Sequence, residues 1–273
     1  MKFAICNETF QDWPFDKAFA YARELGYTGI EFAPFTMEKD ARDISAARRQ
    51  EVRAQAEAAG LEVVGLHWLL AFTEGFYLTS PEKSVRQATG EYLGELARLC
   101  RDLGGSVLVL GSPQQRNLQP LGISHDEGMK HAADTISQAV EAFAQHDVTL
   151  AIEPLGPEEG DFLNHTEQGI ELAQMIGSPQ VKLHLDVKAM SSEDKPIADI
   201  IRDSRDWVVH FHANDANRRG PGMGDIEFAP ILAALEEVNY DGWVSVEVFD
   251  YEPGVEALAS ESIEYLQRTL AGL

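Results

Sequence analysis

Short apolar runs alternate with longer amphipathic stretches along the whole chain, and this alternation limits the available folds more than any other feature. The runs have the near-continuous apolar character of buried parallel strands. We expect strands at residues 3–6, 29–32, 61–68, 106–111, 149–154, 181–186, 208–214 and 243–249. We expect helices at residues 16–25, 45–59, 81–103, 124–145, 166–176, 196–203, 227–238 and 254–270.

The ends of the first three helices carry recognisable signals. Asp16 is interpreted as the cap that opens the first helix, and Pro81 as a first-turn residue of the third. Gly26, Gly60 and Gly104 directly follow the three helices, where a left-handed residue commonly ends a helix.

Eight strands, each followed by a helix in units of about 30 residues, predict a parallel (β/α)8 TIM barrel. An open doubly wound sheet alternates in the same way, but it usually has a glycine-rich first turn. Here Asn7 and Glu8 follow the first strand instead. No linker or low-complexity segment divides the 273 residues, so we expect a single domain over residues 1–273.

Composition excludes several classes of partner. The formal net charge of −23 argues against binding to nucleic acid or to an anionic membrane. The apolar run at the N-terminus is too short for a signal peptide, and no run approaches the length of a membrane helix. Cys6 and Cys100 lie in apolar segments and are interpreted as reduced core residues. We therefore expect a cytoplasmic protein.

Four ionisable residues interrupt the last four apolar strands near their C-terminal ends. Glu153, Asp186, His212 and Glu247 are separated by 33, 26 and 35 residues, about one strand–helix unit each. In a barrel such residues point toward one mouth. Separate ion pairs are the alternative, but three carboxylates and one imidazole in a small space favour one divalent ion. An oxygen-rich set suits Mn²⁺ or Co²⁺, with Mg²⁺ or Zn²⁺ as further candidates.

The chain resembles the sugar isomerase and epimerase group of xylose-isomerase-like barrels, in particular the ketose 3-epimerases related to tagatose and psicose epimerase. The resemblance covers nearly the whole chain. The motifs that carry it are Ala151-Ile152-Glu153-Pro154, Leu185-Asp186, His212-Ala213-Asn214-Asp215-Ala216-Asn217-Arg218, Pro221-Gly222-Met223-Gly224 and Val244-Ser245-Val246-Glu247.

The resemblance implies roles for individual residues. Glu153, Asp186, His212 and Glu247 would be the metal ligands, and the two glutamates would also be the acid and base. Glu158 would lie in the pocket, and Arg218 would hold substrate hydroxyl groups. Two carboxylates on opposite sides of a carbon can remove a proton from one face and return one to the other. A small sugar is then the expected partner. Relatives often form dimers or tetramers, so a homo-oligomer is expected by analogy.

One position departs from the family pattern. In the ketose epimerases a histidine that contacts the substrate stands three residues after the strand-six aspartate, and here Ala189 occupies that position. The neighbouring Lys188 is a candidate replacement, and a solvated lysine is the alternative. His67 and Arg116 are further candidates for substrate contact. The alternative for His67 is a packed histidine of the barrel, and the alternative for Arg116 is a solvated arginine on a loop.

Further residues near the mouth are interpreted from their position. His184 and His210 lie two residues before ligand candidates, one layer lower in the barrel, and are interpreted as packed groups or groups that orient the ligands. Trp13, Trp68 and Phe249 are candidates for an apolar wall of the pocket.

Three other functions compete with an isomerase. An AP endonuclease would need additional histidine ligands that this chain lacks, and its DNA substrate would be repelled. A non-catalytic sugar- or metal-binding protein would have lost a ligand or base, and all four are present. A metal-dependent lyase or dehydratase, acting on an inosose or a 3-keto sugar, would share the first proton abstraction. The motifs leave this lyase open as the alternative to an isomerase or epimerase.

Overall fold

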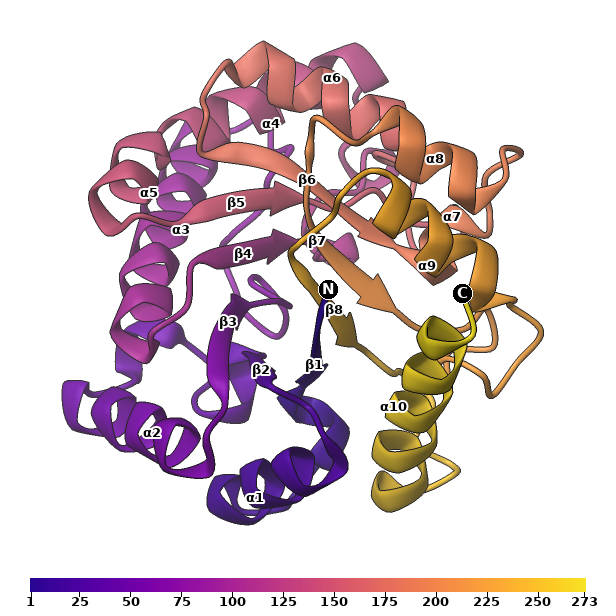
Figure 1. Ribbon diagram of the computed structural model, residues 1–273. Helices are drawn as coiled ribbons and strands as arrows, with labels where there is room; N and C mark the ends of the chain where they lie inside the picture. Colours follow the sequence, from indigo (N-terminus) through magenta and orange to yellow (C-terminus); the bar gives the residue numbers. More distant parts are fainter.

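Each of the eight strands pairs with the next along the chain, and the last also pairs with the first, so the sheet closes into a barrel (Figure 1). The computed structural model describes residues 1–273. The strands are β1 (Lys2–Cys6), β2 (Gly29–Phe32), β3 (Glu62–Leu66), β4 (Val107–Leu110), β5 (Thr149–Ile152), β6 (Val181–Asp186), β7 (Val208–Ala213) and β8 (Trp243–Val246). All eight pairings are parallel. The predicted (β/α)8 barrel is confirmed.

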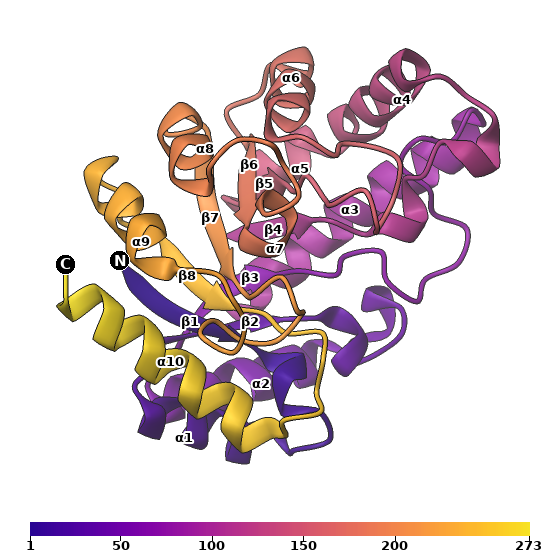
Figure 2. The same ribbon diagram turned by 90° about the vertical axis from the view of Figure 1, so that its right-hand side faces the viewer.

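Helices surround the barrel on its outside (Figures 1 and 2). They are α1 (Phe15–Leu25), α2 (Ala46–Ala59), α3 (Lys83–Leu103), α4 (His125–Ser137), α5 (Val140–His146), α6 (Thr166–Ile176), α7 (Val187–Met190), α8 (Ile197–Asp203), α9 (Phe228–Glu237) and α10 (Val255–Ala271). Short 3₁₀ turns occupy Asn7–Phe10, Pro34–Thr36, Ala41–Asp43, Pro113–Gln115 and Gln119–Leu121. None of the helices combines the length and the apolar composition that crossing a membrane requires.

The predicted helix ends are confirmed, whereas two predicted helix starts are wrong. Gly26, Gly60 and Gly104 adopt left-handed φ angles of 103°, 76° and 101° directly after α1, α2 and α3. Asp16 does not cap α1, because the helix begins one residue earlier and Asp16 lies in its first turn. Pro81 lies before α3 rather than inside it. A proline that fixes its own φ is tolerated just outside a helix as readily as in its first turn.

The single helix expected at residues 124–145 is also wrong, because the segment forms two helices. Ser124 caps α4 through a reciprocal pair of hydrogen bonds with Glu127. The helix then ends at Ser137, and neither Gln138 nor Ala139, which follow it, is a helix breaker. The Ala139 N–H bonds the carbonyl of Ile136, three residues back, at 2.9 Å. This tighter turn, rather than a glycine or proline, separates α4 from α5.

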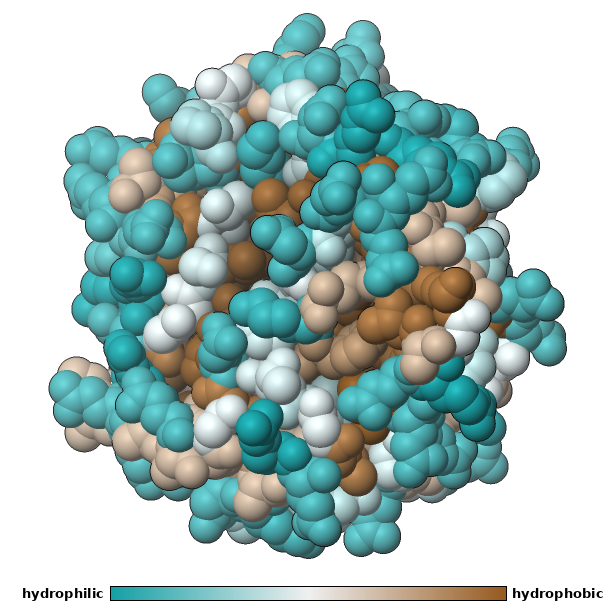
Figure 3. Space-filling view, viewed as in Figure 1, coloured by the Kyte–Doolittle hydropathy of each residue, from teal (hydrophilic) through white to brown (hydrophobic).

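The hydrophobic core and the polar interior occupy different places. A cluster of 62 buried apolar residues includes side chains from the strands and from the helices around them. Inside the barrel, by contrast, Glu31, His184, His210 and His212 are all buried. In the view of Figure 3, hydrophilic side chains cover most of the surface and apolar ones show mainly between them. Ionisable side chains buried inside the barrel are unusual, and they mark where a functional site is to be sought.

Candidate active site and metal centre

The four predicted metal ligands lie at the end of the barrel where the parallel strands finish. Asp186 is the last residue of β6 and His212 lies in β7, while Glu153 and Glu247 directly follow β5 and β8. In Figure 2, β1 runs from the marked N-terminus on the left toward loops on the right. Because the strands are parallel, the C-terminal end of the barrel faces these loops. All four residues are buried. The structure thus brings together the residues that the sequence spacing selected.

Three of these residues form a tight cluster with a fourth residue, a second histidine. One ligand-type atom from each of four residues lies within 4.8 Å of the others, and these residues are Glu153, His184, Asp186 and His212. Glu247 adjoins the cluster, because its Oε2 lies 3.0 Å from Nδ1 of His212. Ligand atoms around a single ion with bonds of about 2.0–2.3 Å stand at roughly similar separations.

The electrostatics of the cluster fit a cation. Burial raises the pKa of Glu153 well above its usual value, and the carboxylates of Glu247 and Asp186 raise it further. Burial also raises the pKa of Asp186, although Lys188 opposes this shift. Negative charges gathered away from water are unfavourable without a partner of opposite sign. Carboxylate oxygens together with imidazole nitrogen form a donor set that suits a divalent ion such as Mn²⁺, Co²⁺ or Zn²⁺.

A hydrogen-bonded chain of alternating carboxylates and imidazoles runs beside this cluster. It consists, in order, of Glu8, His67, Glu247, His212, Glu31 and His210. Successive partners are 2.8–3.1 Å apart. We call it the carboxylate–imidazole chain. Every side chain between the two ends has a hydrogen-bond partner on each side. The carboxylate–imidazole chain therefore fixes the orientation of its members.

The carboxylate–imidazole chain determines the charge of its members. Burial would raise the pKa of Glu247, but His212 and His67 outweigh it and hold this pKa well below its usual value. Burial would lower the pKa of His212, but the carboxylates of Glu247 and Glu31 hold it well above its usual value. Trp68 adds a further donor, with its Nε1 lying 2.9 Å from Glu247 Oε1.

Glu31 orients the ring of the candidate ligand His212. Its Oε2 lies 3.1 Å from Nε2 of His212 and 2.8 Å from Nε2 of His210. With Nε2 engaged, Nδ1 of His212 faces Glu247 and the cluster. Histidine ligands of metals usually have their second nitrogen held in this way. His210, expected as a packed or orienting group, therefore acts on His212 through Glu31. His184 has no such contact, and burial lowers its pKa well below the usual value.

The sequence analysis missed Glu8 and Glu31. Glu31 interrupts the apolar strand Gly29–Phe32, which is the same signal that identified the four ligand candidates. None of the motifs that carry the family resemblance includes Glu31. Glu8 lies two residues after the end of the first strand, so it interrupts no apolar run and carries no such signal.

The loop after β5 places its two neighbouring glutamates differently. Glu158 is exposed, whereas Glu159 is half-buried and lies 2.5 Å from Nζ of Lys188. The pocket role expected for Glu158 stays a prediction. Arg116 is buried, and its Nη1 donates to the backbone carbonyl of Glu153 at 2.7 Å. Burial lowers the pKa of Arg116 to about 10. Its direct contact is thus with the backbone of a candidate catalytic residue.

Cationic and aromatic side chains meet at the rim. Nζ of Lys188 lies 4.8 Å from the ring centre of Phe249, and the guanidinium of Arg218 lies 5.7 Å from the same ring. Arg218 is exposed. Trp68 also packs near Phe249, with ring centres 6.1 Å apart. By contrast, both nitrogens of His67 are engaged by carboxylates, so its contact is with the carboxylate–imidazole chain.

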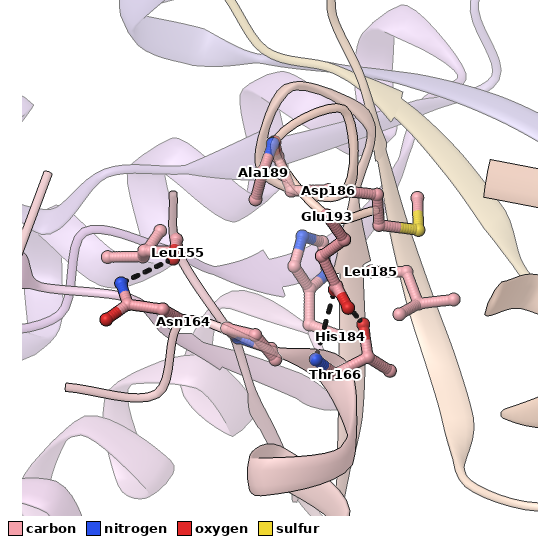
Figure 4. A pocket seen from close by; sticks show the side chains of 10 residues that line it. Leu155, Asn164, Thr166, His184, Leu185, Asp186, Ala189 and Glu193 are labelled. Atoms are coloured by element: carbon pink, nitrogen blue, oxygen red, sulfur yellow. Dashed lines mark hydrogen bonds between the residues drawn. The ribbon is translucent and has the colours of Figure 1, made fainter. Parts of the chain in front are cut away.

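The position that departs from the family pattern lies beside a small pocket (Figure 4). Ala189, Asp186 and His184 are among the residues that line this pocket. The Ala189 N–H donates to Oδ1 of Asp186 at 2.7 Å, and Nδ2 of Asn214 donates to Oδ2 at 2.6 Å. Both oxygens of Asp186 are thus oriented without any side chain from position 189.

The fold is a closed parallel barrel with buried carboxylates and histidines at the C-terminal end of its strands, which is where barrel enzymes have their active sites. The xylose isomerase-like TIM barrel family matches residues 19–269, and this chain belongs to that family.

Individual relatives agree with this assignment. A probable ketose 3-epimerase of Synechocystis sp. is 25% identical over 271 residues, which cover 92% of this chain and 89% of the relative. The 2-oxo-tetronate isomerase of Pectobacterium atrosepticum is 27% identical over 244 residues, which cover 87% of each chain. A crystal structure of D-psicose 3-epimerase in the presence of D-fructose superposes with a TM-score of 0.87 at 21% identity, covering 99% of both chains. At 21% identity this structural similarity supports the fold alone.

Proposed function

We propose that this protein is a metal-dependent sugar epimerase or isomerase that acts on a ketose or a keto-sugar derivative. The observation that carries the proposal is the convergence of Glu153 and Glu247, from β5 and β8, on one buried cluster with Asp186 and His212. Relatives that align over most of the chain are named as an epimerase and an isomerase, which supports this reaction class over the lyase alternative.

The four residues Glu153, Asp186, His212 and Glu247 would hold one divalent ion. When bound, such an ion supplies Lewis-acid stabilisation of the negative charge that develops on a substrate oxygen. Lys188 and Arg218, beside the ring of Phe249, would bind polar groups of the sugar. Glu159 would orient Lys188, with which it forms an ion pair.

The two glutamates would carry the protons. One carboxylate removes the proton from the carbon next to the carbonyl group, and the electron pair left behind forms an enediolate. The other glutamate returns a proton to the opposite face of the same carbon, which gives an epimer. Return of the proton to the neighbouring carbon gives an aldose–ketose isomerisation instead. No redox partner is needed in either case.

Solvent deuterium incorporation tests this proposal. The Mn²⁺- or Co²⁺-loaded protein is incubated in D₂O with ketoses, keto-acids, inososes and 3-keto sugars, and each is followed by NMR. Label at C3 of a recovered ketose indicates 3-epimerisation, and label at C1 of a recovered ketose or at C2 of an aldose product indicates isomerisation. Loss of water from an inosose or 3-keto sugar without label in any ketose would refute the proposal and restore the lyase.

Matched variants test the residues. Glu153→Gln and Glu247→Gln should each abolish exchange while the far-UV circular dichroism stays that of the wild type. Glu171→Gln provides the control, because Glu171 is an exposed glutamate of the outer helix α6 and belongs to none of the candidate site residues. Full activity in both Glu153→Gln and Glu247→Gln would show that the site assignment is wrong.

A further inference from the structure

His184 is a buried histidine that belongs neither to the four candidate ligands nor to the carboxylate–imidazole chain. Its side chain is fully buried inside the barrel, and neither Nδ1 nor Nε2 has a hydrogen-bond partner. A buried polar group without a partner costs about 1–3 kcal/mol. His210 offers a direct contrast, because its Nε2 is engaged by Glu31. The unpartnered nitrogens of His184 therefore need an explanation.

The surroundings of His184 point toward the metal cluster. Its ring centre lies 4.2 Å from that of His212, and its Nε2 lies 4.0 Å from Oε1 of Glu153, too far for a hydrogen bond. A nitrogen of His184 nevertheless shares the 4.8 Å cluster with Glu153, Asp186 and His212. The unpartnered nitrogen thus faces the same space as the candidate ligands.

The position of His184 on its strand explains how it reaches this space. His184 and Asp186 are two residues apart on β6, so their side chains point to the same side of the sheet, into the barrel. Asp186 is the shorter side chain at the rim, and His184 is the longer one in the layer below. Both line the small pocket beside Ala189 (Figure 4).

We infer that His184 is a fifth protein ligand of the divalent ion, approaching it from inside the barrel. This inference rests on the proposed metal-dependent function and extends it. The ligand set then comprises three carboxylates and two imidazoles. Nitrogen ligands favour the later first-row divalent ions, while Mg²⁺ prefers oxygen. The protein should therefore select Co²⁺ or Zn²⁺ strongly over Mg²⁺, more than a set with one imidazole would.

Pulsed electron paramagnetic resonance of the Mn²⁺-loaded protein tests the inference without any assay of turnover. Electron spin-echo modulation counts the imidazole nitrogens bound to the ion. We expect two coordinated imidazoles in the wild type and one in His184→Leu. The variant should also bind Mn²⁺ at least about tenfold more weakly, which is the lower end of the effect of removing even an outer partner of a ligand.

His210→Gln is the matched control, because it removes a histidine from the same layer while keeping a donor for Glu31. It should keep two coordinated imidazoles. One imidazole in the wild type overturns the role of His184 but leaves the four-ligand metal site standing. Failure of the wild type to bind Mn²⁺, Co²⁺ or Zn²⁺ at all overturns both this inference and the metal dependence of the proposed function. If His184→Leu does not fold, the count in the wild type decides alone.

Discussion

Replacement of Glu31 by glutamine tests how the barrel prepares His212 for a metal ion. Glu31 is fully buried, and its Oε2 accepts hydrogen bonds from Nε2 of both His212 and His210. In Glu31→Gln an amide oxygen can take the same position without the charge. The variant therefore keeps the geometry of the two contacts and weakens both.

The size of the effect follows from the strength of one hydrogen bond. A hydrogen bond to a charged group contributes about 1.5–3 kcal/mol, and a neutral one about half as much. Loss of roughly 1–1.5 kcal/mol from the contact that orients His212 corresponds to a fivefold to tenfold weaker metal affinity. Glu31→Leu removes the contact altogether, and its affinity should fall about tenfold to 150-fold, in line with other outer partners of histidine ligands.

Metal titration gives the measurement. The protein is stripped with a chelator and titrated with Mn²⁺, and free Mn²⁺ is followed by its electron paramagnetic resonance signal. Cys100→Ala is the control, because Cys100 is the other buried thiol and its Sγ donates to the backbone carbonyl of Val107 rather than to a group of the site. Its affinity should stay within about twofold of the wild type. Equal affinities of Glu31→Gln, Glu31→Leu and the wild type would refute the orienting role of Glu31.

Three further predictions concern the fold. Gly65→Ala should lower the free energy of unfolding by at least about 2 kcal/mol in urea titration, because a Cβ would lie 1.9 Å from the backbone oxygen of Val107 on the next strand. Cys6 and Cys100 should not react with a thiol reagent until the protein unfolds, when two thiols should appear, because both are buried and burial raises the pKa of Cys100 to about 12. Arg49→Leu should destabilise the protein by about 2–3 kcal/mol in thermal unfolding, because this buried guanidinium bonds two backbone carbonyls and a carboxylate; an unchanged midpoint would contradict this.

The sequence predicted the elements whose residues carry a local signal. Both ends of β6 (Val181–Asp186) were predicted correctly, because alternation and a terminal aspartate mark them. The glycine ends of α1, α2 and α3 were equally clear. The break between α4 and α5 carries no glycine or proline, since it arises from a shift in the hydrogen-bond pattern at Ala139. Such a break depends on how the segment packs around the barrel and not on its own composition.

The site residues divide in the same way, into those with a local sequence signal and those that depend on how distant segments pack. Residues at strand ends could be selected because the barrel determines where those ends meet. Which of Glu158 and Glu159 is exposed depends on the course of a loop, and the ion pair of Glu159 joins this loop to Lys188 of α7, 29 residues further along the chain. The carboxylate–imidazole chain was not predicted, because its members come from five different strands or their ends. Only the closed barrel brings them into a single row.

The two candidate acid/base glutamates differ in their freedom to move, and this difference leads to a final prediction. Glu247 accepts hydrogen bonds from Trp68 and His67, whereas the carboxylate of Glu153 has no hydrogen bond. Oε2 of Glu153 instead occupies the space left by Gly111, where an added Cβ would lie 2.2 Å away. Shortening Glu247 to aspartate must therefore break two contacts, each worth about 1–3 kcal/mol, while shortening Glu153 breaks none.

We thus expect Glu247→Asp to lower kcat/KM by at least tenfold more than Glu153→Asp, as measured by the rate of solvent deuterium exchange into the substrate. The comparison separates orientation from chemistry, because both variants keep a carboxylate that can bind a metal ion and transfer a proton. Equal losses would mean that the position of each carboxylate relative to the substrate decides the rate, and that the carboxylate–imidazole chain serves stability alone. A larger loss in Glu247→Asp would instead mean that the barrel interior, through this chain, sets the geometry of catalysis at its mouth.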